Sequence, residues 1–327
     1  MVCGAELNCW RRLKTGFYYV PAVALCAFAA MGMVLKARDA VGALSWGWQD
    51  LVSPVTSEFK HRGHVNYGVY DLNQRFSRAK GVAIEHIFVS WLSSHASDKI
   101  ISSFEYANDR NRWLMITVEP YAVEGRRSRL LDDIVAGAYD SRIASICRTI
   151  GSLRAPMLVR WGHEMETADI RYPWSGESGE RYIAAYRYFA AKCRANAPNI
   201  YLVWSPKGVA GLRKYYPGKA FVDLVGLSVY ELPKYDLDHF GKVMSFHDAF
   251  LPKYDRVASF DRSVIIAEMG VSGGASYQAR WMANFFRNVQ DFPLLRTAVY
   301  FNGKDTPGAW PGKYGTPDWT IDPKVFE

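Results

Sequence analysis

Eight short apolar runs, each followed by a longer polar or helical stretch, are the feature that most restricts how this 327-residue chain can fold. The runs cover residues 64–71, 84–91, 113–121, 157–164, 200–205, 222–230, 263–268 and 296–302. Their near-continuous hydrophobicity is typical of strands that are buried on both faces. The intervening stretches with apolar side chains at three-to-four spacing include residues 130–150, 179–195 and 277–289. This alternation predicts an α/β fold, a parallel (β/α)8 TIM barrel over residues 64–327.

The main alternative for such a pattern is an open doubly wound sheet. That fold normally carries a glycine-rich phosphate-binding turn after its first strand. No such turn follows Tyr70 and Asp71, and the glycine-rich segment 270–275 comes after the seventh run without the cofactor pattern. The barrel is therefore the favoured fold.

Residues 16–35 contain no charged side chain, and basic residues flank them on both sides. A helix of this length just crosses a bilayer core. We interpret residues 1–40 as an N-terminal hydrophobic helix that anchors the chain in a membrane, and residues 41–63 as a linker. A cleaved signal peptide is the alternative, because residues 27–29 offer the small side chains that a signal peptidase needs. Either interpretation predicts an exported barrel, tethered on the outer (periplasmic) side or secreted.

The formal net charge of +8 raises the question of a nucleic-acid partner. The basic residues are scattered, however, without a Lys/Arg stripe, zinc-finger spacing or an RNA-binding signature. We therefore expect no nucleic acid to bind. A mildly basic surface equally suits an anionic membrane or an acidic polysaccharide, and the charge alone does not choose between them.

Two cysteines of the barrel, Cys147 and Cys193, fall in helical stretches that are expected to be neighbours. A disulfide between them is geometrically conceivable, but two buried free thiols are the favoured interpretation. The cysteines and histidines show no metal-ligand spacing, so we expect neither a metal site nor a cofactor.

Two carboxylates stand where a barrel keeps its catalytic groups, at the C-terminal ends of its strands. The fourth run ends in Glu164 and the seventh in Glu268, each after a strongly apolar stretch. A carboxylate at the edge of a buried strand is costly unless it is paired or used. Glycoside cleavage needs such a pair, one to protonate the leaving oxygen and one to attack the anomeric carbon or activate a water. The sequence therefore predicts a glycoside hydrolase.

The residues around both carboxylates also resemble a known family. The stretch Arg-Trp-Gly-His-Glu-Met at 160–165, with Tyr-Pro-Trp at 172–174, resembles the acid/base motif of glycoside hydrolase family 26. That family contains β-mannanases and some β-1,3-1,4-glucanases. The similarity continues in Trp-Ser-Pro at 204–206, Val-Gly-Leu-Ser-Val-Tyr at 225–230, Ala-Glu-Met-Gly at 267–270 and Asp-Trp at 318–319. It covers nearly everything from residue 64 onward.

The resemblance implies roles for five residues. Glu164 would be the general acid/base and Glu268 the nucleophile of a retaining double displacement. His163 would hydrogen-bond near the reacting centre, and Tyr230 would orient the nucleophile. Trp174 would stack on a sugar or wall it, unless it only packs over the barrel mouth.

Three further residues at strand ends are substrate-binding candidates. Arg160 either forms an ion pair inside the barrel or keeps a strand-end carboxylate ionised. Glu119 and Trp204 end the third and fifth runs. For each of them, ordinary packing of the barrel is the alternative.

The chain departs from the family pattern in two loops. Glu166 and Thr167 stand where the mannanases commonly have Asn-Gly, and residues 170–171 stand where they have a tryptophan before Tyr-Pro-Trp. Lys207 occupies a position where an asparagine often follows Trp-Ser-Pro. Both loops form subsites, so the resemblance implies the hydrolytic chemistry and leaves the backbone sugar open.

The expected function is that of a retaining endo-β-glycanase acting on a β-1,4-linked polysaccharide of β-mannan or β-1,3-1,4-glucan type. We expect Glu164 to be protonated and Glu268 ionised near neutral pH, with carboxyl groups roughly 5 to 5.5 Å apart. The predicted anchor suggests that the enzyme processes the cell's own exopolysaccharide beside a polysaccharide synthase. An inactive glycan-binding barrel that acts as a scaffold is the alternative from another class, and transglycosylation is the enzymatic one.

Overall fold

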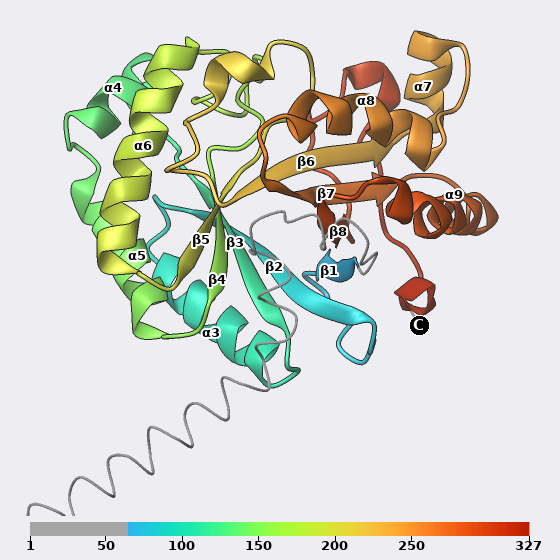
Figure 1. Ribbon diagram of the computed structural model, residues 1–327, viewed down its shortest axis with the longest axis horizontal. Helices are drawn as coiled ribbons and strands as arrows, with labels where there is room; N and C mark the ends of the chain where they lie inside the picture. Colours follow the sequence, from blue (N-terminus) through green and yellow to red (C-terminus); the bar gives the residue numbers. More distant parts are fainter. Residues whose placement is uncertain (1–64, 327) are drawn as a thin grey trace, which may run out of the picture. The chain divides into compact units, whose positions relative to one another are not determined.

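The computed structural model describes residues 65–326, which form a closed barrel of parallel strands running in order from β1 to β8 (Figure 1). Each strand pairs with the next along the chain, and β8 closes the barrel against β1. The strands are β1 (Asn66–Tyr70), β2 (Val82–Ser90), β3 (Trp113–Glu119), β4 (Met157–Trp161), β5 (Ile200–Trp204), β6 (Leu224–Glu231), β7 (Ser263–Val271) and β8 (Leu295–Phe301). Each overlaps one of the eight predicted runs, so the predicted barrel is confirmed.

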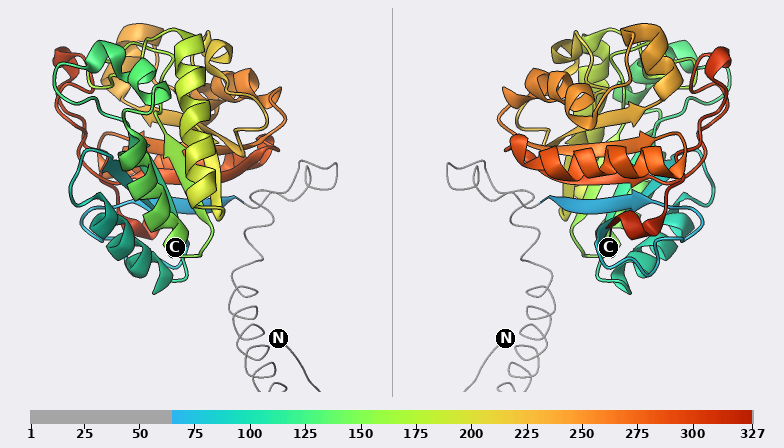
Figure 2. Two further views of the ribbon diagram at one scale, coloured as in Figure 1. Left: turned by 90° about the vertical axis from the view of Figure 1, so that its left-hand side faces the viewer. Right: turned by 90° about the vertical axis from the view of Figure 1, so that its right-hand side faces the viewer.

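Helices cover the outside of the barrel, and Figure 2 shows α6 and α9 running along the strands. The α-helices are α3 (Ala96–Asn108), α4 (Leu130–Val135), α5 (Asp140–Ser152), α6 (Gly179–Asn196), α7 (Pro233–Phe240), α8 (Phe246–Ala258) and α9 (Ala275–Asn288). The amphipathic stretch 130–150 is divided between two helices, α4 and α5. Gly137 lies between α4 and α5 with φ of 83°, a left-handed conformation that interrupts a helix.

The apolar core has two layers. A small inner cluster fills the barrel with Ile84, Met115, Leu158, Val203, Leu224, Ile265, Ala267 and Val299. A larger outer cluster lies between the strands and the helices. Strand alternation decides the layer of each side chain. In β4, Leu158 is in the inner cluster while Val159 and Trp161 are in the outer one, so Arg160 follows Leu158 on the inner face.

The two cysteines of the barrel form a disulfide between α5 and α6. Cys147 and Cys193 are fully buried, and their Cα atoms lie 5.1 Å apart. The expectation of two free thiols is therefore wrong. Neighbouring helices bring the two side chains together, an adjacency that the spacing of the cysteines in the sequence does not encode.

Reduction of the Cys147–Cys193 disulfide is expected to lower the free energy of unfolding by about 2–4 kcal/mol. The bond joins positions 46 residues apart and therefore restricts the unfolded chain. Urea unfolding with and without reductant measures the effect. A variant with both cysteines replaced by serine is the control, because its midpoint should not respond to reductant. Equal midpoints for the oxidised and reduced native chain would contradict the prediction.

The predicted anchor or signal segment at 1–40 and the linker at 41–63 lie outside the described residues. Within residues 65–326, no helix combines the length and the apolar character that crossing a membrane requires.

Candidate active site

Glu268 points into the barrel because β7 carries a β-bulge. The pairing of β6 with β7 shifts register at this point and leaves Ala267 without a partner, so β7 has one extra residue. Ala267 belongs to the inner cluster and Met269 to the outer one. Strict alternation from Ala267 would turn Glu268 outward. The bulge turns it inward instead, where it meets Arg160 and Tyr230.

Both carboxylate oxygens of Glu268 accept a hydrogen bond. Arg160 Nη1 donates to Oε1 at 2.5 Å, and the Tyr230 hydroxyl donates to Oε2 at 2.7 Å. The Arg160 side chain is fully buried and that of Glu268 is 10% exposed. Charge-assisted hydrogen bonds of this kind are strong and directional. They fix the carboxylate in one orientation at the C-terminal end of the barrel.

Glu164 lies in the turn that follows β4, in an unusual backbone conformation. Its φ is 55°, a left-handed value that few residues other than glycine adopt. Its backbone N–H donates to the carbonyl of Ser205 at 2.8 Å, which ties the turn to the end of β5. The side chain is 8% exposed, and Lys207 Nζ lies 3.4 Å from its Oε2. Strained residues of this kind concentrate at functional sites.

The two carboxyl groups influence each other's protonation. Burial raises the pKa of Glu268, the charge of Glu164 raises it further, and the net pKa lies above the ordinary value although Arg160 and Tyr230 oppose both effects. Burial also raises the pKa of Glu164, but Lys207, followed by His163, a hydrogen bond with Ser228 and Arg160, outweighs it, and that pKa lies below the ordinary value. This order is the reverse of the one expected from the sequence. After burial, the ammonium of Lys207 is the largest cause.

His163 presents a neutral imidazole beside Glu164. The side chain is 1% exposed, and burial lowers its pKa well below the ordinary value. Within residues 65–326, neither ring nitrogen has a hydrogen-bond partner. The ring packs against Tyr172 at 4.7 Å and Phe88 at 6.0 Å between centroids. Both nitrogens are also shielded from solvent, so in this structure the imidazole packs against the turn that carries Glu164.

Trp174 is fully buried and offers no face to a sugar. Its Nε1 donates to the carbonyl of His163 at 2.7 Å, so it holds the turn that carries Glu164. Tyr172 stacks on its ring at 4.8 Å and is only partly buried. The negative charges of Glu164 and Glu268 both add to the burial that raises the pKa of Tyr172, so this ring lies near both carboxylates. The sequence prediction chose Trp174, but Tyr172 is the aromatic residue of the same motif that is partly accessible.

Of the two remaining candidates, Glu119 lies near the site and Trp204 does not. Burial raises the pKa of Glu119 to about 6, and the charge of Glu268 adds to this shift. Trp204 is fully buried in the outer cluster, with its ring 5.1 Å from Tyr216 and 5.4 Å from Phe260. The prediction that Trp204 binds substrate is therefore wrong.

Aromatic residues that the sequence prediction missed line the barrel mouth. Tyr70 and Phe301, at the ends of β1 and β8, stack with centroids 4.5 Å apart. The ring of Trp319 lies 4.8 Å from that of Tyr230, and Trp310 lies 5.8 Å from Trp319. These rings form a contiguous aromatic wall that starts beside Glu268 and leads outward, and within it Trp319 is fully buried while Tyr230 and Trp310 are partly exposed. Asp-Trp at 318–319 was the one sequence signal that pointed to it.

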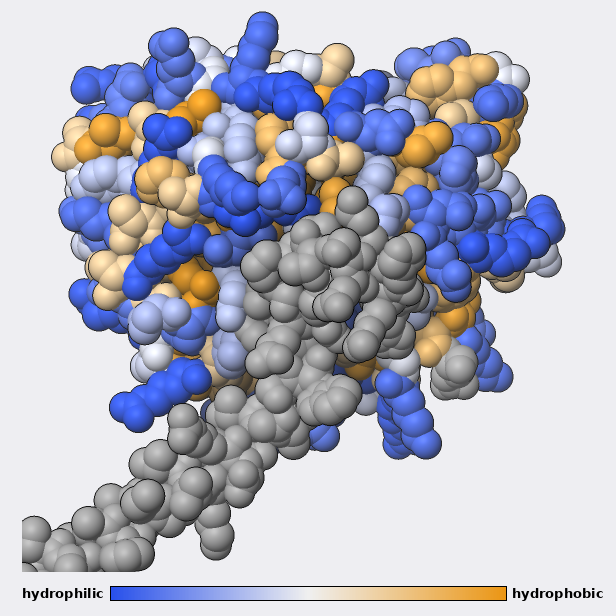
Figure 3. Space-filling model, in the orientation of Figure 1, coloured by the Kyte–Doolittle hydropathy of each residue, from blue (hydrophilic) through white to orange (hydrophobic). Residues whose placement is uncertain are grey.

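The outer end of this aromatic wall reaches α7. The ring of Tyr235 lies 5.2 Å from that of Trp310 and 5.3 Å from that of Tyr314. Leu237 and Phe240 on the same helix are 54% and 56% exposed, and Figure 3 shows hydrophobic residues gathered over α7. Exposed apolar patches of this kind mark binding surfaces.

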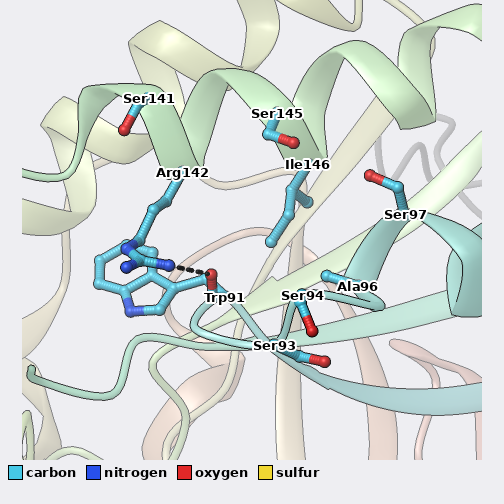
Figure 4. A pocket seen from close by; sticks show the side chains of 9 residues that line it. All are labelled: Trp91, Ser93, Ser94, Ala96, Ser97, Ser141, Arg142, Ser145 and Ile146. Carbon is cyan, nitrogen blue, oxygen red and sulfur yellow. Dashed lines mark hydrogen bonds between the residues drawn. The ribbon is translucent and has the colours of Figure 1, made fainter.

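A separate groove of about 380 Å³ lies between α3 and α5 (Figure 4). It is lined by Trp91, Ser93, Ser94, Ala96, Ser97, Ser141, Arg142, Ser145 and Ile146. Arg142 donates to the carbonyl of Trp91 at 3.4 Å, and the ring of Trp91 is almost fully buried. The groove contains no carboxylate and shares no residue with the site around Glu164 and Glu268.

Comparison with known proteins identifies what the barrel resembles. Residues 120–292, just over half of the chain, match the model of glycosyl hydrolase family 26. A β-1,3-xylanase of an Alcaligenes species is 23% identical over 212 residues, which is 58% of this chain and 44% of the relative. Endoglucanase H of Acetivibrio thermocellus is 26% identical over 233 residues, which is 67% of this chain and 25% of the relative. The chain therefore spans less than half the length of these two relatives.

Among solved structures, the β-mannanase BoMan26A of Bacteroides ovatus superposes with a TM-score of 0.60. The alignment covers 86% of this chain and 91% of the mannanase, with 12% sequence identity. At that identity, the superposition establishes the shared barrel fold.

Proposed function

Because the chain belongs to glycosyl hydrolase family 26 and is a glycoside hydrolase, we propose that it cleaves a β-linked polysaccharide with retention of anomeric configuration. In this proposal Glu164 is the general acid/base and Glu268 the nucleophile. The observation that carries it is the arrangement of Glu268. A buried carboxylate held by Arg160 and Tyr230 is oriented for attack, and Glu164 faces the same mouth from the end of the neighbouring β4 and β5 pair.

The proposed reaction has two steps, and Glu164 donates a proton in the first and accepts one in the second. In the first, Glu268 attacks the anomeric carbon while Glu164 gives its proton to the departing oxygen, so that a covalent glycosyl ester forms and the leaving sugar is released. In the second, Glu164 takes a proton from water, the water oxygen attacks the anomeric carbon, and the carboxylate of Glu268 leaves. Arg160 and Tyr230 stabilise that carboxylate whenever it carries charge, and His163 supports the turn that carries Glu164.

The proposed substrate is long enough to occupy several subsites. Flat sugar faces pack on accessible aromatic rings, and Tyr230, Trp310 and Tyr235 are partly exposed along the aromatic wall, with the fully buried Trp319 packed between Tyr230 and Trp310. This supports cleavage within a polymer. The relatives are named for different backbones, a β-1,3-xylan for one, a glucan for another and a β-mannan for the third. We retain a β-1,4-linked mannan or a β-1,3-1,4-glucan as the proposed backbone.

A substrate panel tests the function. The full-length protein is incubated with β-mannan, mixed-linkage β-glucan, cellulose and xylan, and new reducing ends are measured for wild type, Glu164→Ala and Glu268→Ala. Cleavage of one polymer that both substitutions abolish would support the proposal and identify the backbone. Activity that survives either substitution would overturn the assignment of roles. Binding without cleavage of any polymer would favour the inactive glycan-binding barrel.

Replacing Tyr230 by phenylalanine is expected to lower kcat/KM by roughly 10- to 100-fold, the range for a hydrogen bond to a charged group. The hydroxyl of Tyr230 lowers the pKa of Glu268, so its loss raises that pKa. In the free chain the pKa of Glu268 lies above that of Glu164, so loss of the proton held by Glu268 sets the basic limb of the kcat/KM profile, and this limb should move to higher pH. Tyr300→Phe is a matched control, since its hydroxyl bonds the carbonyl of Trp319 instead. An unchanged basic limb would contradict this role.

We further propose that residues 16–35 anchor the enzyme in a membrane, with the barrel on the outer side, and that it trims the cell's own β-linked exopolysaccharide beside the synthase. The uncharged stretch with basic flanks supports export. Fractionation of cells followed by protease treatment of intact spheroplasts tests the location. Deletion of the gene with unchanged polymer amount and chain length would contradict the role in exopolysaccharide processing.

A further inference from the structure

A lysine lies beside the proposed acid. Lys207 Nζ is 3.4 Å from Glu164 Oε2, and the lysine side chain is 38% exposed against 8% for the glutamate. The ammonium therefore pairs with Glu164 and remains accessible from the barrel mouth. Within residues 65–326, Glu164 is its only carboxylate partner within ion-pair distance.

The loop that carries Lys207 is held from two sides. Glu166 Oε1 accepts hydrogen bonds from the backbone N–H of Gly208 at 2.8 Å and of Val209 at 3.3 Å. On the other side of the loop, the ammonium of Lys253 donates to the backbone carbonyl of Lys207 at 2.8 Å. These contacts fix the position of Lys207 in the site. The chain departs from the family pattern at both Glu166 and Lys207, and the hydrogen bonds of Glu166 hold the loop that carries Lys207.

The two arginines near Glu164 already have anionic partners. Arg171 Nη2 lies 2.6 Å from Asp169, and Arg160 lies 2.5 Å from Glu268. The ammonium of Lys253 donates to the backbone carbonyls of Lys207 and Ser228. Within residues 65–326, Lys207 is therefore the cation that forms an ion pair with Glu164, the group that must hold a proton. An ammonium at that distance stabilises the carboxylate and opposes protonation, as the lowered pKa of Glu164 indicates. A substrate anion that pairs with Lys207 would remove this effect and permit Glu164 to take up its proton.

We propose that Lys207 binds an anionic group on a sugar next to the cleaved bond, and that the substrate is therefore an acidic β-glycan. A uronic acid carboxylate and an acidic substituent on a neutral sugar offer the same chemistry to an ammonium. This inference rests on the proposed function, because it assigns the substrate class of the same site. In this proposal Lys207 is a specificity-determining residue. The proposal also gives a role to the ion pair between Lys207 and Glu164 in the free enzyme.

Matched neutral and acidic polymers test the proposal. β-Mannan and mixed-linkage β-glucan are each compared with a form in which part of the C6 hydroxymethyl groups is oxidised to carboxylate, and with a form esterified with succinate. Wild type is expected to cleave an acidic form with a kcat/KM roughly 10- to 100-fold higher than its neutral parent, the range for a charge-assisted hydrogen bond. Preference for the oxidised or the succinylated form distinguishes the two sources of charge.

Variants then assign this preference to Lys207. Lys207→Met should lose the preference for the acidic polymer, while Lys207→Arg should retain most of it. Lys219→Met removes a charge from an exposed lysine that pairs with Asp261 and serves as the control. Equal cleavage of acidic and neutral polymers by wild type, or an equal loss on both in Lys207→Met, would overturn the proposal and leave the glycosidase function intact.

A binding measurement keeps the two proposals separate. In the Glu268→Gln background, calorimetric titration with oxidised and neutral oligosaccharides should show roughly 10-fold tighter binding of the oxidised form, lost on adding Lys207→Met. Equal affinities would refute the anionic subsite. If no polymer is cleaved at all, the proposed hydrolytic function fails, and this comparison still decides whether Lys207 binds an anion.

Discussion

Replacing Glu268 by glutamine is expected to lower kcat/KM on the identified polymer by about 10⁴-fold or more, the size of loss seen when a covalent nucleophile is removed. The amide lacks the charge that attacks the anomeric carbon. Glutamine keeps the shape of the side chain and an acceptor for Tyr230 Oη, which donates at 2.7 Å in the native chain. Initial rates and the denaturation midpoint are measured together, so that loss of activity is separated from loss of fold.

Rescue by azide distinguishes loss of the nucleophile from a structural defect, because a misfolded variant would not regain activity with azide. In Glu268→Ala the missing side chain leaves room for a small anion, which can attack the anomeric carbon of an activated aryl β-glycoside directly. The product expected from a retaining enzyme without its nucleophile is the α-glycosyl azide, of inverted configuration. Glu180→Ala, an exposed position in the first turn of α6, is the control and should neither lose activity nor respond to azide. A variant at Glu268 that retains a tenth of the native rate would refute the assignment.

The barrel could be predicted because strands buried on both faces require continuous apolar runs, a requirement that is local in sequence. The inner and outer layers follow from alternation along each strand. By that rule Val203 faces inward and Trp204 outward, so the position of Trp204 in the outer cluster was in principle readable from the sequence. Its place at a strand end suggests a site residue, whereas the alternation places it among the residues that pack against the helices.

The orientation of Glu268 is a different case. The extra residue at Ala267 turns the carboxylate inward, and a bulge leaves no signature in hydrophobic periodicity. The place of Glu268 at the end of the seventh run and the resemblance to a family of glycosidases pointed to this glutamate, but neither gives its inward orientation. The exchange of roles between Trp174 and Tyr172, and the pairing of Cys147 with Cys193, likewise depend on contacts between segments that are distant in the chain.

Protonation is the least predictable property of the site because it sums charges from several elements. The motif predicts a protonated Glu164, but Lys207 on the following loop lowers that pKa in the free chain. The net charge of +8 and the ammonium of Lys207 both favour an anionic partner. The charge of the whole chain did not choose between a membrane and an acidic polysaccharide, whereas a lysine 3.4 Å from the proposed acid is specific to the reaction site.

Replacing Glu164 by alanine is expected to reduce polymer cleavage by about 10²- to 10⁴-fold, the usual contribution of a general acid/base. The loss should depend on the leaving group. A dinitrophenyl β-glycoside departs without a proton, so its first step should remain fast while the second step, which needs Glu164 as a base, becomes slow. A burst of dinitrophenolate followed by a slow steady state is therefore the expected time course, measured by stopped flow.

The same variant separates Glu164 from Glu268 by stereochemistry and by pH. Azide should accelerate the slow second step and yield the β-glycosyl azide, of retained configuration, because Glu268 still forms the covalent intermediate. The basic limb of the wild-type kcat/KM profile reports loss of the last proton of the carboxyl pair, without which Glu164 has no proton to donate, and it should be absent in Glu164→Ala. A variant that cleaves polymer and aryl glycoside with equal losses, or that keeps the basic limb, would show that the proton comes from another group. Glu119, whose pKa is raised to about 6 near the same mouth, would then be the residue to test.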